Sequence, residues 1–161
     1  MDHRVIEIYT DGSCHAQYNI GVWGAILFID AEKIIIKGEV PDTTHNRMEL
    51  LAVIKAIGFS NEKYEHASIV IYTDSQYAYL IPERKEKLKR NLFVTKKGNP
   101  IQNSDLVKIL INQIETHSIT FIKVKAHQKS GSGETDGQIN YNTEVDKLVR
   151  QMVRESVKRH Y

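Results

Sequence analysis

The sequence is poor in the residues that build disulfide frameworks and membrane spans. Among 161 residues there is a single cysteine, Cys14, so one chain can form neither an internal disulfide nor a metal site made of several cysteines. No apolar run approaches the length needed to cross a bilayer, and no targeting pattern precedes the first predicted strand. These absences predict a soluble protein of a reducing compartment, the cytoplasm, with no membrane partner.

Composition is otherwise ordinary for a globular protein, with 41% hydrophobic and 26% charged residues. The length favours one domain over residues 1–161, which we expect to be monomeric. The net charge of +2 is unevenly distributed: residues 83–97 hold seven basic and two acidic side chains, a net +5, which leaves −3 elsewhere. Such a charge run is usually a solvated helix face, whereas next to an acidic site it favours contact with a polyanion.

Two segments repeat one pattern, a β-strand that ends on an aspartate. Residues 7–13 read EIYTDGS and residues 69–75 read IVIYTDS. If the two strands lie side by side, Asp11 and Asp74 face each other across a narrow gap. Carboxylates this close repel each other unless a cation lies between them, so the repeat is the first indication of a metal site.

Hydrophobic periodicity predicts an α/β protein whose strands and helices are mixed along the chain. The polar segment 11–20 is expected to be a turn-rich connection, and three closely spaced strands favour an antiparallel meander. A helix precedes the fourth strand, which favours pairing that strand parallel to the first. The expected strands are 4–10, 21–29, 33–40, 68–73 and 118–124, and the first of them is expected to break at Gly12. Helices are expected to begin near residues 47, 74, 82, 103 and 142, and the first of them to end near Phe59, where Gly58 and Asn61 suggest a stop.

Four acidic residues lie at the starts or ends of predicted elements, and each has an ordinary explanation. Asp11 suits a turn, Asp74 suits a helix N-cap, Asp146 suits a first helical turn, and Glu49 suits a capping box with Asn46 as N-cap. Together the four predict a site for Mg²⁺ or Mn²⁺, since carboxylate oxygens suit these ions whereas zinc prefers histidine and cysteine. Two such ions can activate a water and stabilise the leaving oxygen of a phosphodiester.

Five segments in order span nearly the whole chain: YTDGSC, TTHNRMELLAVIKAI, IYTDSQYA, FIKVKAH and NTEVDKLVR. In this order and spacing they resemble the motifs of type 1 ribonuclease H. The resemblance implies an α/β fold with a five-stranded mixed sheet of order 3-2-1-4-5, flanked by helices. It also implies an endonuclease that hydrolyses the RNA strand of RNA/DNA hybrids with two divalent metal ions, leaving 5′-phosphate and 3′-hydroxyl ends.

The resemblance also implies roles for individual residues. The four acids match the metal-binding acids of the family, and His127 matches a loop histidine that transfers a proton or aids product release. The remaining histidines, at positions 3, 15, 45, 66, 117 and 160, are interpreted as ordinary surface or core residues. The implied substrate contacts are Thr44 at a DNA-strand phosphate, Asn46 and Gln76 in the minor groove, Asn142 beside the site, and a basic handle of Arg84, Lys85, Lys87, Lys89 and Arg90.

Three alternatives stay open. The first is a DNA-transferring enzyme such as an integrase or transposase core, although such sites usually hold three acids rather than four. The second is a non-catalytic module that binds hybrids, which the complete set of acids disfavours. The third is the nuclease domain of a reverse transcriptase; Met1 just ahead of the first strand favours a free-standing protein instead.

Overall fold

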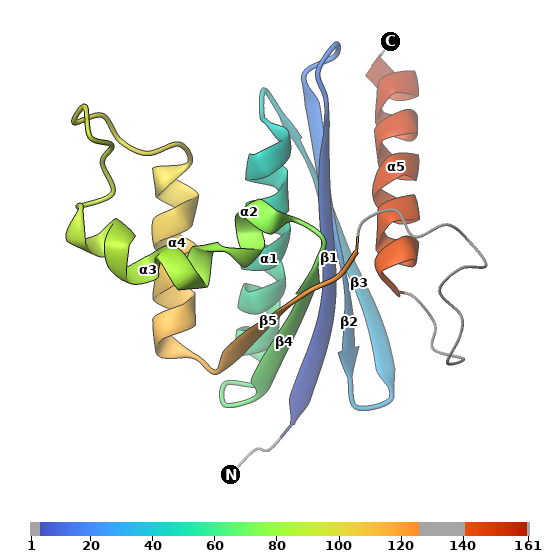
Figure 1. Cartoon of the computed structure of the whole chain (residues 1–161). Coiled ribbons are helices and arrows are strands. Elements are labelled where there is room, and N and C mark those ends of the chain that lie inside the picture. Colours follow the sequence, from blue (N-terminus) through green and yellow to red (C-terminus); the bar gives the residue numbers. More distant parts are fainter. Residues whose placement is uncertain (1–3, 126–140, 161) are drawn as a thin grey trace.

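A five-stranded mixed sheet of order β3-β2-β1-β4-β5 forms the centre of the protein (Figure 1). The structure, a computed structural model, describes residues 4–125 and 141–160. The first three strands form the predicted antiparallel meander, and β4 pairs parallel to β1 and to β5. The predicted fold class and strand order are therefore confirmed. The strands are β1 Val5–His15, β2 Ile20–Ile29, β3 Glu32–Pro41, β4 Ser68–Thr73 and β5 Ile119–Lys123.

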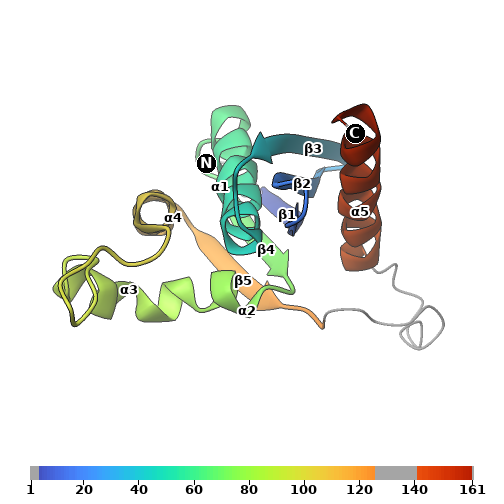
Figure 2. The ribbon, with the colours of Figure 1, turned by 90° about the horizontal axis from the view of Figure 1, so that it is seen from above.

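Helices cover both faces of the sheet, so the protein has three layers. Seen from above, α1 and α4 lie on one side of the sheet and α5 lies on the other, while α3 extends away from the sheet beside α4 (Figure 2). None of the helices in the described segments is long and apolar enough to cross a membrane. The helices are α1 His45–Lys63, α2 Gln76–Tyr79, α3 Ile81–Arg90, α4 Ser104–Thr116 and α5 Tyr141–His160.

The main hydrophobic core lies between α1 and the sheet. Alternate residues of β1 face this core, and Ile6 and Ile8 are completely buried against Leu50 and Ile57 of α1. Strand β2, which lies between β1 and β3, is buried along nearly its whole length, as its continuous apolar sequence predicts. This two-sided packing fixes β1, and β1 in turn carries the first acid of the site.

The first strand is longer than its sequence predicts. β1 continues through Asp11 to His15, because these residues pair with β2 as far as the partners His15 and Ile20. Gly12 does not break the strand. A Cβ at this position would lie 2.4 Å from the carbonyl carbon of Met48, so the glycine allows α1 to approach β1 closely. By contrast β4 ends at Thr73, the partner of Thr10, and β1 therefore extends beyond it.

Two helix caps also differ from the prediction. The N-cap of α1 is Thr44, whose hydroxyl accepts a hydrogen bond from the backbone N–H of Arg47 at 3.2 Å. The capping box of Asn46 with Glu49 is therefore wrong, since both residues lie inside the helix. Likewise Ser75, rather than Asp74, caps α2 through a 3.1 Å bond from the N–H of Ala78. Helix capping therefore does not explain why acidic residues occupy positions 49 and 74.

Helix α1 extends further at its C-terminal end than the sequence predicts. The helix was expected to stop near Phe59, where Gly58 and Asn61 suggest an end, but it continues to Lys63. Ser60 is fully buried, so this last turn packs against the protein, and its hydroxyl is satisfied within the helix by donating to the carbonyl of Ala56 at 2.9 Å. Tertiary packing therefore outweighs the stop signal.

Candidate active site

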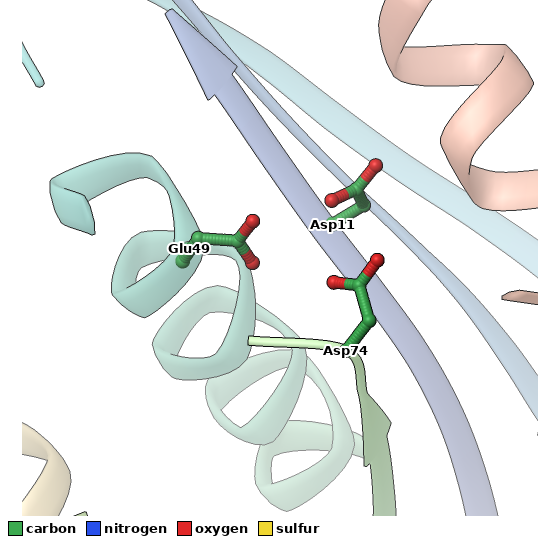
Figure 3. Close-up of side chains that lie close together, drawn as sticks. All are labelled: Asp11, Glu49 and Asp74. Atoms are coloured by element: carbon green, nitrogen blue, oxygen red, sulfur yellow. The ribbon is translucent and has the colours of Figure 1, made fainter. Parts of the chain in front are cut away.

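Three carboxylates from distant parts of the chain meet at one point. Asp11 lies in β1, Glu49 in α1, and Asp74 directly after β4, and their side chains point toward one another (Figure 3). One carboxylate oxygen of each lies within 4.8 Å of the others. Asp11 and Glu49 are only 6% and 2% exposed, and Asp74 is half-buried. The predicted approach of Asp11 to Asp74 is confirmed, and Glu49 joins them.

The local structure explains this meeting. Thr10 and Thr73 are neighbours in the parallel β1–β4 pair, so the next residue in each segment is an aspartate at the same level of the sheet. Glu49 reaches the same place because Gly12 lets the backbone of α1 pass close to β1. The N-terminal part of α1 is further held by Arg47, which pairs with Asp105 through two bonds of 3.0 and 2.9 Å. The guanidinium of Arg47 lowers the pKa of Asp105 to about 2.

The fourth predicted acid, Asp146 of α5, lines the same pocket, a cavity of about 410 Å³. It stands outside the group of three, and its carboxylate pairs with Arg150 of the same helix at 2.8 Å. Its negative charge nevertheless contributes to raising the pKa of Asp11. Helix α5 comes close to the sheet at Gly24, where a Cβ would lie 3.3 Å from side-chain carbons of Leu148 and Val149.

Burial and mutual repulsion make the pocket electrostatically unfavourable for the acids alone. Burial, followed by the charges of Glu49, Asp74 and Asp146, raises the pKa of Asp11 from 3.8 to about 9. Burial is also the largest cause that raises the pKa of Glu49, and its hydrogen bond with His45 opposes this rise. The carboxylates can therefore be ionised together only if a positive charge lies among them.

The donor set fits a hard divalent cation. All the converging ligand atoms are carboxylate oxygens, which suit Mg²⁺ or Mn²⁺. In addition, Oε2 of Glu49 is buried and has no hydrogen-bond partner among the residues that the structure describes. A buried carboxylate oxygen without a partner is costly, and coordination to a cation would remove that cost. The acidic cluster can therefore hold a divalent metal ion.

Sequence reasoning missed two positively charged or ionisable residues in this pocket, His45 and Arg150. Nε2 of His45 lies 3.3 Å from Oε1 of Glu49, and this hydrogen bond raises the pKa of His45. The sequence alone indicates an ordinary histidine at position 45. The signal was present, because in both pairs the basic residue and its acid are four residues apart, the spacing at which side chains meet on a helix. Without knowing which acids form the site, however, this spacing indicates only a surface ion pair.

Two of the residues predicted to contact substrate line the pocket. Asn46 and Gln76 line it together with the acids. Thr44 lies at the N-terminus of α1 as its cap, next to the pocket in sequence. Asn142 is buried in the first turn of α5, where its amide donates to the carbonyl of Lys125 at 3.4 Å. His127 lies outside the described residues.

The predicted basic handle is helix α3, and its charges divide into two groups. Lys89 and Lys85 lie 2.7 and 3.8 Å from the carboxylate of Glu115 in α4, which ties them to the body of the protein. The other three, Arg84, Lys87 and Arg90, are exposed, and within residues 4–125 and 141–160 no ion pair is found for them. Arg84 also lines a second cavity of about 240 Å³, and Tyr77 lines both this cavity and the acidic pocket. The handle therefore adjoins the site.

Solved structures share this architecture and define its class, the ribonuclease H fold. A crystal structure of LC9-RNase H1, described as a type 1 RNase H with the type 2 active-site motif, superposes with a TM-score of 0.75 at 21% identity, covering 94% of this chain and 72% of that one. The foamy viral protease-reverse transcriptase in complex with dsDNA superposes with a TM-score of 0.70 at 24% identity, covering 91% and 92%. At these identities the likeness concerns the fold.

Sequence comparison identifies the family. Residues 3–154 match the family model for RNase H. Ribonuclease H of Chlorobium phaeobacteroides (strain BS1) is 35% identical over 154 residues, which cover 94% of this chain and 97% of the relative. Ribonuclease H of Ehrlichia canis (strain Jake) is 38% identical over 149 residues, covering 92% and 94%. This chain therefore belongs to the ribonuclease H family, and it is an enzyme of that type.

Proposed function

We propose that this enzyme is an endonuclease that hydrolyses the RNA strand of RNA/DNA hybrids and leaves 5′-phosphate and 3′-hydroxyl ends. We further propose that it acts with two Mg²⁺ ions, for which Mn²⁺ can substitute. The observation that carries this proposal is that one carboxylate oxygen each of Asp11, Glu49 and Asp74 lie within 4.8 Å of one another, while a buried oxygen of Glu49 has no hydrogen-bond partner in the described part of the chain.

The four acids are the proposed metal ligands. Asp11, which has three acidic neighbours, would hold the ions jointly with Asp74, Glu49 and Asp146. The chemistry that two divalent ions supply when bound at such a site is activation of a water for in-line attack and stabilisation of the leaving 3′-oxygen. The protein contributes fixed positions for the ligands, which β1, α1, β4 and α5 provide.

Hybrid recognition is proposed to occur around the pocket. The amides of Asn46 and Gln76 can both donate and accept, which suits the 2′-hydroxyls displayed in the minor groove of a hybrid. Thr44 at the N-terminus of the 19-residue helix α1 suits a DNA-strand phosphate. The basic residues of α3, namely Arg84, Lys85, Lys87, Lys89 and Arg90, are proposed to grip the nucleic acid backbone without regard to sequence.

Two further residues are assigned by the family resemblance. Asn142 is proposed to lie near the substrate, in the first turn of the helix that carries Asp146. His127 is proposed to transfer a proton or to aid product release. We also propose that residues 1–161 act as a single-domain monomer in the cytoplasm, which light scattering after size exclusion would test against the chain mass of 18.5 kDa.

The decisive experiment compares four substrates of one sequence: RNA/DNA hybrid, double-stranded DNA, double-stranded RNA and single-stranded RNA, each with Mg²⁺ or with EDTA. We expect cleavage of the RNA strand of the hybrid alone, dependent on metal, with 5′-phosphates on the products. Asp74→Asn should abolish cleavage while circular dichroism shows an unchanged fold. Cutting or joining of DNA would favour an integrase-like or transposase-like enzyme, and hybrid binding without cleavage would favour a binding module.

A further inference from the structure

His45 is a histidine that contacts one of the four acids of the pocket. It is the first residue of α1, and its ring reaches forward over one helical turn to Glu49, with Nε2 3.3 Å from Oε1. Its side chain is 62% exposed and lines the pocket, whereas the side chain of Glu49 is 3% exposed. The histidine therefore bridges solvent and the most deeply buried acid of the site.

The two oxygens of Glu49 have different surroundings. Oε1 accepts the hydrogen bond from His45, while Oε2 is buried and has no partner in the part of the chain that the structure describes. A carboxylate held through one oxygen has lost most of its rotational freedom, so the direction of the other oxygen is fixed as well. Carboxylates that bind metals are commonly held in this way by a hydrogen-bonding neighbour, and such neighbours contribute substantially to metal affinity.

We propose that His45 is a positioning residue for the metal site: its Nε2–H donates to Oε1 of Glu49 and thereby presents Oε2 to the cation. This inference rests on the proposed role of Glu49 as a metal ligand. Because the acceptor is a carboxylate, the ring must carry its proton on Nε2 for this bond to form. The helix that carries His45 is capped by Thr44, one residue earlier.

The other acid–base pair of the pocket provides a contrast. Arg150 and Asp146 are also four residues apart and 2.8 Å from each other, but Asp146 is 20% exposed and water can satisfy its carboxylate. Glu49 has no such access. The hydrogen bond from His45 therefore has a greater effect on the orientation of its acid than the one from Arg150 has.

The test measures Mn²⁺ binding by titration calorimetry in the absence of nucleic acid. We expect His45→Ala to raise the Kd for Mn²⁺ by about tenfold, the lower end of the range for such neighbours. His45→Gln keeps an N–H donor on a side chain of similar reach, and we expect it to restore most of the affinity. His66→Ala, an exposed histidine in the α1–β4 connection, is the matched control and should leave the Kd unchanged. Circular dichroism and thermal melting in EDTA verify that each variant is folded.

Kinetics provide a second readout. If His45 positions a ligand, His45→Ala lowers kcat at limiting Mn²⁺, recovers at saturating Mn²⁺, and leaves the KM for the hybrid unchanged. An unchanged Kd with a raised KM would overturn the inference and make His45 a substrate contact. A lower Kd would overturn it too, by showing that the histidine competes with the cation for Glu49.

Glu49→Gln separates this inference from the function on which it rests. If Glu49→Gln weakens Mn²⁺ binding but His45→Ala does not, only the role of His45 is wrong. If neither variant changes Mn²⁺ binding, the assignment of Glu49 as a ligand fails, and the role of His45 fails with it. The proposed cleavage of hybrids is tested independently by the substrate comparison.

Discussion

The charged side chains of the acidic pocket and those of the basic helix α3 differ in burial and in the charges around them. In the pocket, Asp11 and Glu49 are buried next to like charges, and the pKa of Asp11 rises to about 9. On α3, the basic residues other than Lys85 are exposed, and Lys85 and Lys89 pair with Glu115. The buried acids therefore lower the stability of the metal-free protein, and they are suited to binding a cation at one point. The charges of α3 lower stability little, and they form a diffuse positive surface.

Removing the central acid should produce the largest effect. Asp11→Asn takes away a carboxylate with three acidic neighbours, and we expect kcat to fall by at least about 100- to 1,000-fold, the loss typical of one electrostatic stabiliser. The same change should stabilise the metal-free protein, because it relieves repulsion. Steady-state cleavage and urea unfolding in EDTA measure both. Full activity, or a less stable metal-free protein, would contradict the view of the pocket as strained.

Stability of the metal-free protein should depend on pH through this acid. Since the pKa of Asp11 is about 9 in the folded state against 3.8 ordinarily, the folded state holds more protons than the unfolded state between these values. Rising pH therefore favours unfolding, by up to about 1.4 kcal/mol per pH unit for each proton. Urea unfolding in EDTA from pH 5 to pH 9 should show this decline.

Two controls sharpen that measurement. Saturating Mg²⁺ should flatten the decline, because the cation takes the place of the proton, and Asp11→Asn should flatten it without metal. An equally steep decline in Asp11→Asn would assign the pH dependence to other groups.

Adding a methyl group to Gly12, where β1 and α1 are in close contact, should displace the backbone of α1 and with it the pocket. Gly12→Ala places a Cβ 2.4 Å from a backbone carbon of Met48, so we expect a loss of about 1–3 kcal/mol in the free energy of unfolding, as for other overpacked sites. Mn²⁺ affinity should fall too, because Glu49 moves with the helix.

The matched control is Gly58→Ala in the same helix. Apart from the adjoining backbone of α1, no atom of the described residues lies within 4 Å of the added Cβ, and alanine favours the helix, so stability should rise by about 0.8–1 kcal/mol. Equal effects of the two changes would show that close packing at Gly12 is unimportant.

The basic helix should respond to salt rather than to metal. Replacing Arg84, Lys87 and Arg90 with alanine should raise the KM for the hybrid and reduce the slope of log affinity against log salt by about 0.9 for each lost phosphate contact. Lys85→Gln with Lys89→Gln should have less effect, since Glu115 already engages both lysines. Mn²⁺ binding without nucleic acid should stay unchanged in both variants. A metal defect in either one would show that α3 and the pocket are coupled.

The sequence predicted the elements and their order better than the contacts between them. The repeated strand ending gave the approach of Asp11 to Asp74, because equivalent positions of paired parallel strands lie side by side. Glu49 was assigned to the site through the family resemblance, while its local interpretation as part of a capping box was wrong. A helix start and a metal ligand use the same residue types, and only the packing of α1 on β1 distinguishes them.

The residues that escaped prediction depend on surroundings that a local sequence pattern does not show. Gly12 looked like a strand break because a local pattern does not show that Met48 lies against it. His45 looked ordinary because its importance depends on where Glu49 points. Leu92 and Phe93 both have positive φ, which their residue types do not predict, since leucine and phenylalanine rarely adopt this conformation.

Because β1 continues unbroken past the end of β4, the direction of the Asp11 side chain depends on the number of residues in the strand ahead of it. Successive side chains of a strand point to opposite faces, so inserting a single residue between Val5 and Asp11 would turn the carboxylate toward the wrong layer, while inserting two would restore its direction. The connection between α1 and β4 carries no such constraint. Length changes in natural or engineered variants should therefore accumulate in that connection and be absent from the first half of β1.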